Sequence, residues 1–476
     1  MDGFKHNKLV LTALAVVMLF GSSFSQKQLN RDRAQLGLVR TDNPLENAPP
    51  MLAFTTVALG GFRGLIANAL WIRATDLQQD GKYFEMVQLA DWITKLQPHF
   101  TTVWIHQAWN MAYNISVKFP DKEDRWRWVR RGIELLRDEA IPLNPHEPLL
   151  YRELAWFFQH KMGQNMDDGH LYYKFSWAYD FQKVIGEPPY SFDRFIEPKT
   201  DADRENGRQL KDTYKMEAKL MKSIDEQYGP LDWRLPEAHA IYWASKGLEK
   251  AKGNDLLSLR RVVYQSMQTA FTRGRLVVNK IDGNAELSPN PDIVQRVNDT
   301  YEEMIRANPM ENIGHAHQNF LRYAVTTLYL YNREAEARKW WNVFRAKYPE
   351  EASRDPVMEN YIVQRVTEIV RDEGKDKILA AIEGYLSRSY YLLAIGEDDQ
   401  ALGYERFASQ CWVLHQKKID IERKPDIKAR LDLGPYKGIK QRVLDRILDS
   451  TSGQFSPQLA AQLRTRLGLA ADTQPT

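Results

Sequence analysis

The sequence predicts an all-α protein built from stacked pairs of antiparallel helices, with a hydrophobic segment at its N-terminus. Two observations predict this fold class. Apolar residues recur at the three- and four-residue spacing of an amphipathic helix through most of the chain, and the alternating runs typical of strands are few. Aromatic residues make up 11% of the sequence, including 13 Trp, and rings of this size suit the packing of one helix against another.

The charge balance disfavours a nucleic-acid-binding protein. Lys and Arg total 65 and Asp and Glu total 62, which gives a formal net charge of +3. A protein that binds the phosphate backbone usually carries a marked basic excess. The single cysteine, Cys411, cannot form an internal disulfide, so we expect stability to come from packing. We therefore expect other proteins, and no nucleic acid, as partners.

Residues 1–25 have the pattern of an export signal. Lys5 and Lys8 precede an apolar run from Leu9 to Phe20, and small residues follow as far as Ser25. The run is shorter than the roughly 17 residues that a spanning helix needs, so two outcomes stay open. Cleavage after Ser25 would release a periplasmic protein. Retention would leave a single-pass membrane anchor with the body outside the cytoplasm, the arrangement that we prefer to a buried first helix of a cytoplasmic protein.

Residues 26–50 are polar, end in two prolines and are typical of a linker. Residues 51–72 are again apolar, but Arg63 and three glycines interrupt them. A charge and several glycines make a poor membrane span. This segment is either a buried lead-in to the first helix pair or a hairpin that lies on the membrane surface.

A helix pair is predicted directly after this segment. Apolar residues fall at helical spacing from Leu65 to Gln79, and again from Phe84 to Ile93. Gly81 lies between the two patterns, where a tight turn needs a residue that tolerates positive φ. Pro98 ends the second helix because its ring cannot continue the hydrogen-bond ladder.

The residues Ala74, Gly81, Tyr83 and Pro98 make this pair resemble a tetratricopeptide repeat. That family has a small residue where the paired helices touch, a glycine at the turn, an aromatic residue two positions later and a proline after the second helix. Met86 departs from the pattern, because the family usually has a small residue there. The resemblance implies a right-handed superhelix, or α-solenoid, that binds other proteins.

Further matches define the predicted domain organisation. Trp104 and Ala108 repeat the bulky-then-small pair, and Asn332 replaces glycine at a later turn as the next-best residue for positive φ. We predict an N-terminal array over residues 51–186 and a second array over 236–415, in which a helix from Glu237 to Gly247 pairs with one from Leu256 to Phe271. Residues 187–235 are predicted as a loop followed by one long polar helix, Asp201 to Tyr228. Residues 416–476 form a C-terminal helical tail.

The sequence shows no catalytic or cofactor motif. It lacks a phosphate-binding glycine loop, a zinc-binding His-Glu-x-x-His helix and a Gly-x-Ser-x-Gly nucleophile turn. Cys411 and His415 share a helix face, but no third metal ligand accompanies them. We therefore predict a protein that is not an enzyme and that has no catalytic, cofactor-binding or metal-binding residues. An enzyme with an unrecognised site stays open as an alternative.

Repeat proteins of this kind bind partners on a concave surface lined by the first helix of each pair. The positions that the resemblance assigns to this groove include three tryptophans, a residue type that dominates binding hot spots. The predicted groove residues are Asn68, Trp71, Thr75, Ile105, Trp109, Tyr113, Arg152, Trp156 and His160. The leading hypothesis is a scaffold in a cell-envelope assembly, such as a secretion, pilus or surface-polymer apparatus. The alternative is a soluble periplasmic protein that binds peptides.

Overall fold

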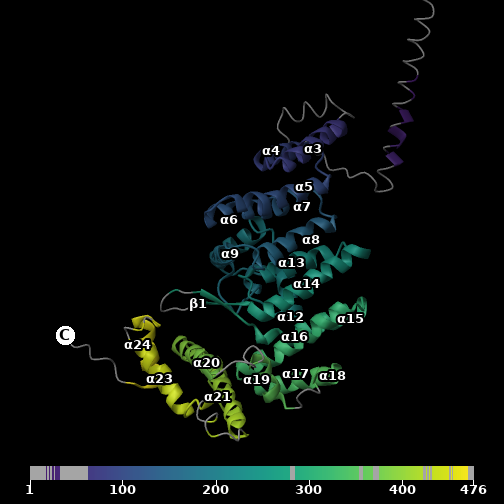
Figure 1. The fold of residues 1–476 in the computed structure, drawn as a ribbon. Helices are drawn as coiled ribbons and strands as arrows, with labels where there is room; N and C mark the ends of the chain where they lie inside the picture. The colour runs from purple at the N-terminus through teal and green to yellow at the C-terminus, as the bar shows by residue number, and fades with distance from the viewer. Residues whose placement is uncertain are drawn as a thin grey trace, which may run out of the picture. The chain divides into compact units, whose positions relative to one another are not determined.

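A computed structural model of the chain describes residues 63–278, 285–352, 357–367, 375–421, 431–449 and 454–469, with a few single positions elsewhere (Figure 1). Most of the predicted signal or anchor, the linker at 26–50 and residues 51–62 lie outside this description. Among the described residues, no helix combines the length and the apolar composition needed to cross a membrane.

The structure is 78% helix and 2% strand, which confirms the all-α prediction. Contacts divide the chain into two compact units, Met1–Val103 and Trp104–Thr476. We call them the N-terminal and the C-terminal unit and describe each by itself.

The N-terminal unit contains the predicted first helix pair. Helices α3 (Arg63–Gln79) and α4 (Tyr83–Leu96) pack against each other. Gly81 adopts the expected positive φ, 73°, in the turn between them. Ala74 is buried in one cluster with Leu77 and Met86. The long Met86 side chain therefore occupies the contact where the repeat family usually has a small residue.

The first part of the C-terminal unit also consists of paired helices. Helix α6 packs closely on the helix before it, because a Cβ atom at Gly132 would lie only 3.0 Å from the Ala108 carbonyl oxygen. Trp104 is 4% exposed and Ala108 is fully buried, as the sequence predicts. The α-helices of this part are α5 (Thr101–Trp109), α6 (Lys122–Glu134), α7 (Ile141–Leu143), α8 (Pro148–Trp156), α9 (His170–Ile185), α10 (Asp193–Ile196), α11 (Asp201–Asp212), α12 (Ala218–Tyr228), α13 (Pro236–Leu248) and α14 (Gly253–Arg273).

Three of these helices continue into a π-helical segment. The segments are η2 (Asn110–Ile115) after α5, η4 (Leu135–Ala140) after α6 and η5 (Phe157–Met162) after α8. A short 3₁₀ turn, η3 (Ser116–Lys118), completes the first of them. In a π-helical segment the backbone hydrogen bonds join residues five apart instead of the four of an α-helix. Such segments are frequent at functional sites. The sequence analysis did not predict them.

The prediction of one long helix from Asp201 to Tyr228 is wrong. The structure has α11 and α12 instead, separated by residues 213–217. Lys215 in this break has a φ of 54°, which a continuous helix does not allow. The Tyr214 ring packs against Trp177 and Phe181 at centroid distances of 5.6 and 4.8 Å. This contact with α9 draws the chain out of the helical path.

The helix pair predicted at the start of the second array is present. Helix α13 includes residues 237–247, α14 includes residues 256–271, and the two helices pack together. A small antiparallel hairpin follows, with β1 (Arg275–Val278) pairing with β2 (Ala285–Ser288). The hairpin buries Leu276 against Ala178 and Leu235.

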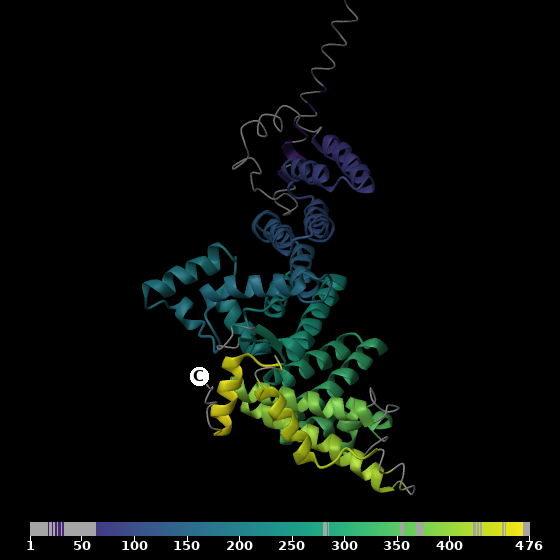
Figure 2. The same cartoon turned by 60° about the vertical axis from the view of Figure 1, so that its left-hand side comes forward.

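The rest of the C-terminal unit is again helical. Asn332, at the turn between α16 and α17, has a φ of 59°, which confirms the role predicted for it. Helices α20 and α21 lie side by side in both views (Figures 1 and 2). The elements are η6 (Pro291–Ile293), α15 (Val294–Ala307), α16 (Glu311–Leu330), α17 (Glu334–Lys347), α18 (Pro349–Ala352), α19 (Met358–Thr367), α20 (Lys375–Ile395), α21 (Asp398–Ile421), α23 (Tyr436–Leu448) and α24 (Pro457–Leu467).

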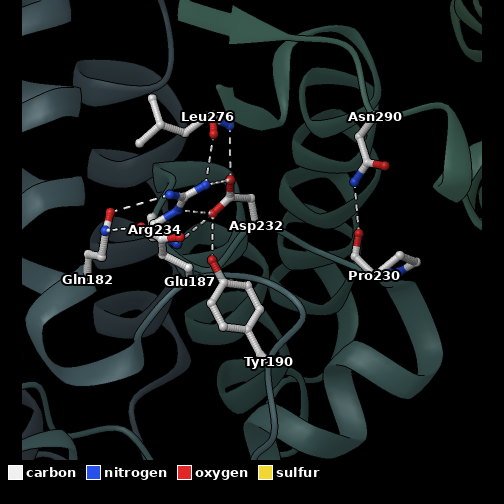
Figure 3. A network of polar contacts seen from close by, with 8 residues as sticks. All are labelled: Gln182, Glu187, Tyr190, Pro230, Asp232, Arg234, Leu276 and Asn290. Atoms are coloured by element: carbon white, nitrogen blue, oxygen red, sulfur yellow. Dashed lines mark hydrogen bonds and ion pairs between the residues drawn. The ribbon is translucent and has the colours of Figure 1, made fainter. Parts of the chain in front are cut away.

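A continuous buried segment, residues 231–244, runs through the C-terminal unit into α13. Asp232 and Arg234 form an ion pair at its start, with 2.7 Å between Arg234 Nη2 and Asp232 Oδ2 (Figure 3). Tyr190 donates to Asp232 Oδ1 at 2.7 Å. The backbone of Leu276 donates to Asp232 Oδ2 at 2.9 Å and accepts from Arg234 at 2.8 Å. The pair therefore connects the 186–190 loop, α13 and strand β1.

Two glycines in helix interiors give a matched stability test. A Cβ atom at Gly403 in α21 would overlap the Leu330 carbonyl oxygen of α16, whereas one at exposed Gly384 in α20 meets open space. We expect Gly403→Ala to lower the free energy of unfolding by about 1–3 kcal/mol through overpacking. Gly384→Ala should raise it by about 0.5–1 kcal/mol, because alanine favours the helix. Urea unfolding measures both, and equal effects would contradict the close approach of α21 to α16.

Candidate functional site

Two adjoining cavities in the C-terminal unit form a groove along α8, η5 and α14. The larger, which we call the polar cavity, has a volume of about 580 Å³ and is lined by Trp156, Gln159, His160, Gln164, Gln265, Gln268, Thr269, Thr272 and Arg273. The smaller, the aromatic cavity, has a volume of about 290 Å³ and is lined by Trp109, Arg152, Glu153, Trp156, Ser258, Arg261, Val262 and Gln265. Trp156 and Gln265 belong to both linings.

Stacked rings form one wall of the groove. Trp109 stacks on Tyr113 with 4.3 Å between ring centroids, and Trp156 stacks on His160 at 4.5 Å. The Tyr113 hydroxyl lies 3.1 Å from His160 Nδ1 and so joins η2 to η5. Each tryptophan stands directly before a π-helical segment and each stacking partner lies within it. The same arrangement therefore occurs twice, at the end of α5 and at the end of α8.

Glu153 anchors this wall from below. Its side chain is buried, and its Oε2 accepts a hydrogen bond from the Trp109 indole nitrogen at 2.9 Å. Arg152 pairs with its other carboxylate oxygen. The Trp109 ring is thus held in place although it is 36% exposed. Because Glu153 neutralises Arg152, this arginine does not act as an isolated cation.

The titrating groups of the wall are shifted toward their neutral forms. Burial, together with the charge of Glu153, raises the pKa of Tyr113. Burial, together with the charge of Lys161, lowers the pKa of His160. Both shifts favour the uncharged side chain at neutral pH. The stacked wall therefore offers ring faces and hydrogen-bonding groups without net charge.

The structure brings four of the predicted groove residues to the cavities, namely Trp109, Arg152, Trp156 and His160. Tyr113 supports the wall through its contact with His160, and half-buried Ile105 lines neither cavity. The other three predicted residues lie in the N-terminal unit. There Asn68 and Thr75 are exposed on α3, and the Trp71 ring lies 6.0 Å from Phe100.

The opposite wall comes from α14, which the sequence analysis did not assign to the groove. The repeat family would place the first helix of the pair there, but α13 is buried along residues 236–244 and has no free face. The second helix instead presents a polar stripe at three- and four-residue spacing, which places its members on one helix face. The stripe consists of Ser258, Arg261, Gln265, Gln268 and Thr272. This spacing was the available signal for the missed residues.

A cluster of buried charges was also missed by the sequence analysis. Lys161 pairs with Asp167 at 2.8 Å, and its ammonium lies 5.1 Å from the centre of the Tyr113 ring. Lys174 and Glu237 are buried close to each other and to Arg273, whose Nε lies 4.0 Å from Glu237 Oε1. These residues come from η5, the loop before α9, and helices α9, α13 and α14, so no local sequence pattern predicts the cluster.

The pKa values of this cluster follow its burial. Burial lowers the pKa of Lys174 to about 8, with Glu237 opposing the shift and Arg273 adding to it. Burial also raises the pKa of Glu237. Perturbed buried groups of this kind occur at catalytic sites and in structural ion networks alike.

Lys174 gives a pH test of this burial. Its pKa is lower in the folded chain than the model-peptide value of 10.5, so the unfolded chain binds more protons between the two values. Stability should therefore rise with pH, by about 1 kcal/mol from pH 7 to pH 9. We expect Lys174→Met to abolish this increment, measured by urea unfolding at both pH values. Lys183→Met, at an exposed position of α9, is the control and should keep it; an unchanged increment in Lys174→Met would contradict the assignment.

In the part of the chain that the structure describes, no group of three or more His, Cys, Asp or Glu residues is arranged to hold a metal ion. Cys411 and His415 are both buried, and the His415 ring lies 2.9 Å from the Leu431 carbonyl oxygen. Comparison of the chain with protein-family models, with curated proteins and with solved structures finds no match.

Proposed function

We propose that the chain is a non-enzymatic, tetratricopeptide-like scaffold that binds an extended segment of a partner protein in the groove between α8–η5 and α14. The proposal includes the right-handed superhelical arrangement that the resemblance implies. The observation that carries it is the pair of adjoining cavities that share Trp156 and Gln265. Neither cavity is isolated, so one chain segment can occupy both.

An extended peptide suits this geometry. Side chains at positions i and i+2 of an extended chain point the same way and lie roughly 7 Å apart. Two such side chains can enter neighbouring cavities while the backbone passes over Trp156. The fixed Trp109 ring and the stacked Trp156 ring supply apolar area that needs little further ordering, which favours affinity.

The N-terminal sequence supports a place at the cell envelope. The run from Leu9 to Phe20 has the features of an export signal or anchor. We therefore propose that the scaffold acts in an envelope assembly, with its body outside the cytoplasm and the N-terminal segment in the membrane. A soluble periplasmic peptide-binding protein is the alternative. Intact mass of the mature protein separates the two, because the alternative requires cleavage after Ser25.

One observation favours a second candidate, an enzyme. Lys174 and Glu237 are two buried ionisable groups whose pKa shifts favour their uncharged forms. Arg273 lies near Glu237 and also lines the polar cavity. Such a pair can exchange protons with a bound molecule. The scaffold is preferred because these groups also have a structural explanation, as buried groups that lie among the charges of neighbouring helices.

Substitutions at two tryptophans distinguish an effect on partner binding from an effect on folding stability. Trp104 is a core ring, whereas Trp109 is exposed at the aromatic cavity. We expect Trp104→Ala to lose about 3–5 kcal/mol of folding stability. Trp109→Ala should stay folded and lose 2 kcal/mol or more of partner binding, about 30-fold in Kd.

The measurement is thermal unfolding of each variant, together with recovery of crosslinked partner proteins from native membranes. A Trp109→Ala chain that melts as early as Trp104→Ala would show that the ring is part of the core. A stable Trp109→Ala chain that recovers all partners would remove the groove from the binding function.

A further inference from the structure

The polar cavity differs from an ordinary protein-binding surface in being lined by four glutamine side chains. Three of them use their oxygen inside the protein. Gln164 accepts from Arg273 at 3.3 Å, Gln265 accepts from Gln159 at 2.9 Å and Gln268 accepts from Tyr301 at 2.7 Å. Their NH₂ groups remain as donors on the lining, since each carboxamide has two N–H bonds.

Gln159 provides the complementary group. Its side chain is 5% exposed, and its NH₂ group donates to Gln265. Its oxygen is buried and has no hydrogen-bond partner in the protein. A buried polar atom without a partner costs free energy, so a molecule that donates a hydrogen bond to it would bind favourably. A ligand group that both accepts and donates hydrogen bonds would therefore complement this lining.

This requirement does not depend on the orientation of the carboxamides. The oxygen and nitrogen of a glutamine side chain are interchangeable in shape. If Gln159 and Gln265 were both turned over, the free buried atom of Gln159 would be a donor and Gln265 would offer an oxygen. In either orientation the free atoms of these two carboxamides are one acceptor and one donor. A carboxylate lacks the donor and an ammonium lacks the acceptor, whereas a carboxamide has both.

The charged and hydroxyl side chains around the cavity already make contacts within the protein. Arg273 donates to the Gly163 carbonyl, to Gln164 and to Asn165, and lies near Glu237. The Thr269 and Thr272 hydroxyls donate to backbone carbonyls of their own helix at 3.0 Å. His160 contacts Tyr113 and Trp156. Arg273, the arginine of this lining, is thus held by hydrogen bonds to neutral groups of the protein, and its Nε lies 4.0 Å from the Glu237 carboxylate.

We propose that the polar cavity binds an Asn or Gln side chain of the partner segment, and that the aromatic cavity binds an apolar side chain two positions away. The inference rests on the proposed function, because it names the residues that the groove selects. Hydrogen bonds between carboxamides of the cavity and the carboxamide of the ligand give this selectivity. Leaving one of these groups unpaired should weaken binding by about tenfold.

The test is selection of peptides from a phage library of random linear sequences on the full chain. The chain carrying both Trp109→Ala and Trp156→Ala serves as the background. We expect enrichment of Asn or Gln two positions from Leu, Ile, Phe or Trp. Enrichment of Asp, Glu or a free C-terminal carboxylate at that position would overturn the inference and leave the proposed function standing. Enrichment no greater than on the background chain would overturn the proposed function as well.

A variant that introduces a charge tests the same residues, because it should change which side chain of the peptide the cavity selects. Gln265→Glu turns a shared lining residue into a carboxylate, so selection should shift from Asn or Gln to Lys or Arg by about tenfold. Gln209→Glu, at an exposed position of α11, is the control and should leave the selection unchanged. A new preference cannot arise from a misfolded chain. An unchanged preference in Gln265→Glu, or the same shift in Gln209→Glu, would contradict the assignment of the polar cavity.

Discussion

The buried ion pair of Asp232 and Arg234 joins three parts of the C-terminal unit, namely the loop at Tyr190, the segment that enters α13 and strand β1. Both side chains are nearly inaccessible to water (Figure 3). Tyr190 and the backbone N–H of Leu276 donate to Asp232, and Arg234 donates to Gln182 and to the Leu276 carbonyl oxygen. Removing one partner of such a pair leaves an uncompensated buried charge, at a cost of about 3–5 kcal/mol. The pair therefore fixes one path for the segment that enters α13, because alternative paths would bury unpaired charges.

The groove follows from the position of α13. This helix packs against α8, η5 and α14, so the two walls of the groove rest on one buried helix. Since α13 has no free face, the polar face of α14 is left to meet the rings of α8 and η5. The π-helical segments after Trp109 and Trp156 place Tyr113 and His160 beneath the rings, and their contact joins the two helices. Some residues therefore belong both to the lining and to its support, since His160 lines the polar cavity and also supports the Trp156 ring.

Local sequence chemistry predicted those features that depend on one residue and its neighbours. Gly81 and Asn332 were assigned to turns because few other residues tolerate positive φ, and Trp104, which is buried, was matched to the bulky position of a repeat. The break between α11 and α12 was missed because it depends on the contact of Tyr214 with Trp177, 37 positions earlier in the chain. The α14 wall was missed for a similar reason. Which helix of the pair is left exposed depends on the packing of α13 against α8 and η5, which lie tens of residues earlier in the chain.

Photocrosslinking in living cells tests directly whether partner proteins bind in the groove. A photoreactive amino acid replaces Thr272, which lines the polar cavity, or Asp255, which is exposed on the same helix outside both cavities. We expect a discrete crosslinked partner from position 272 and none from position 255. The same adducts from both positions, or no adduct from position 272, would contradict binding in the groove.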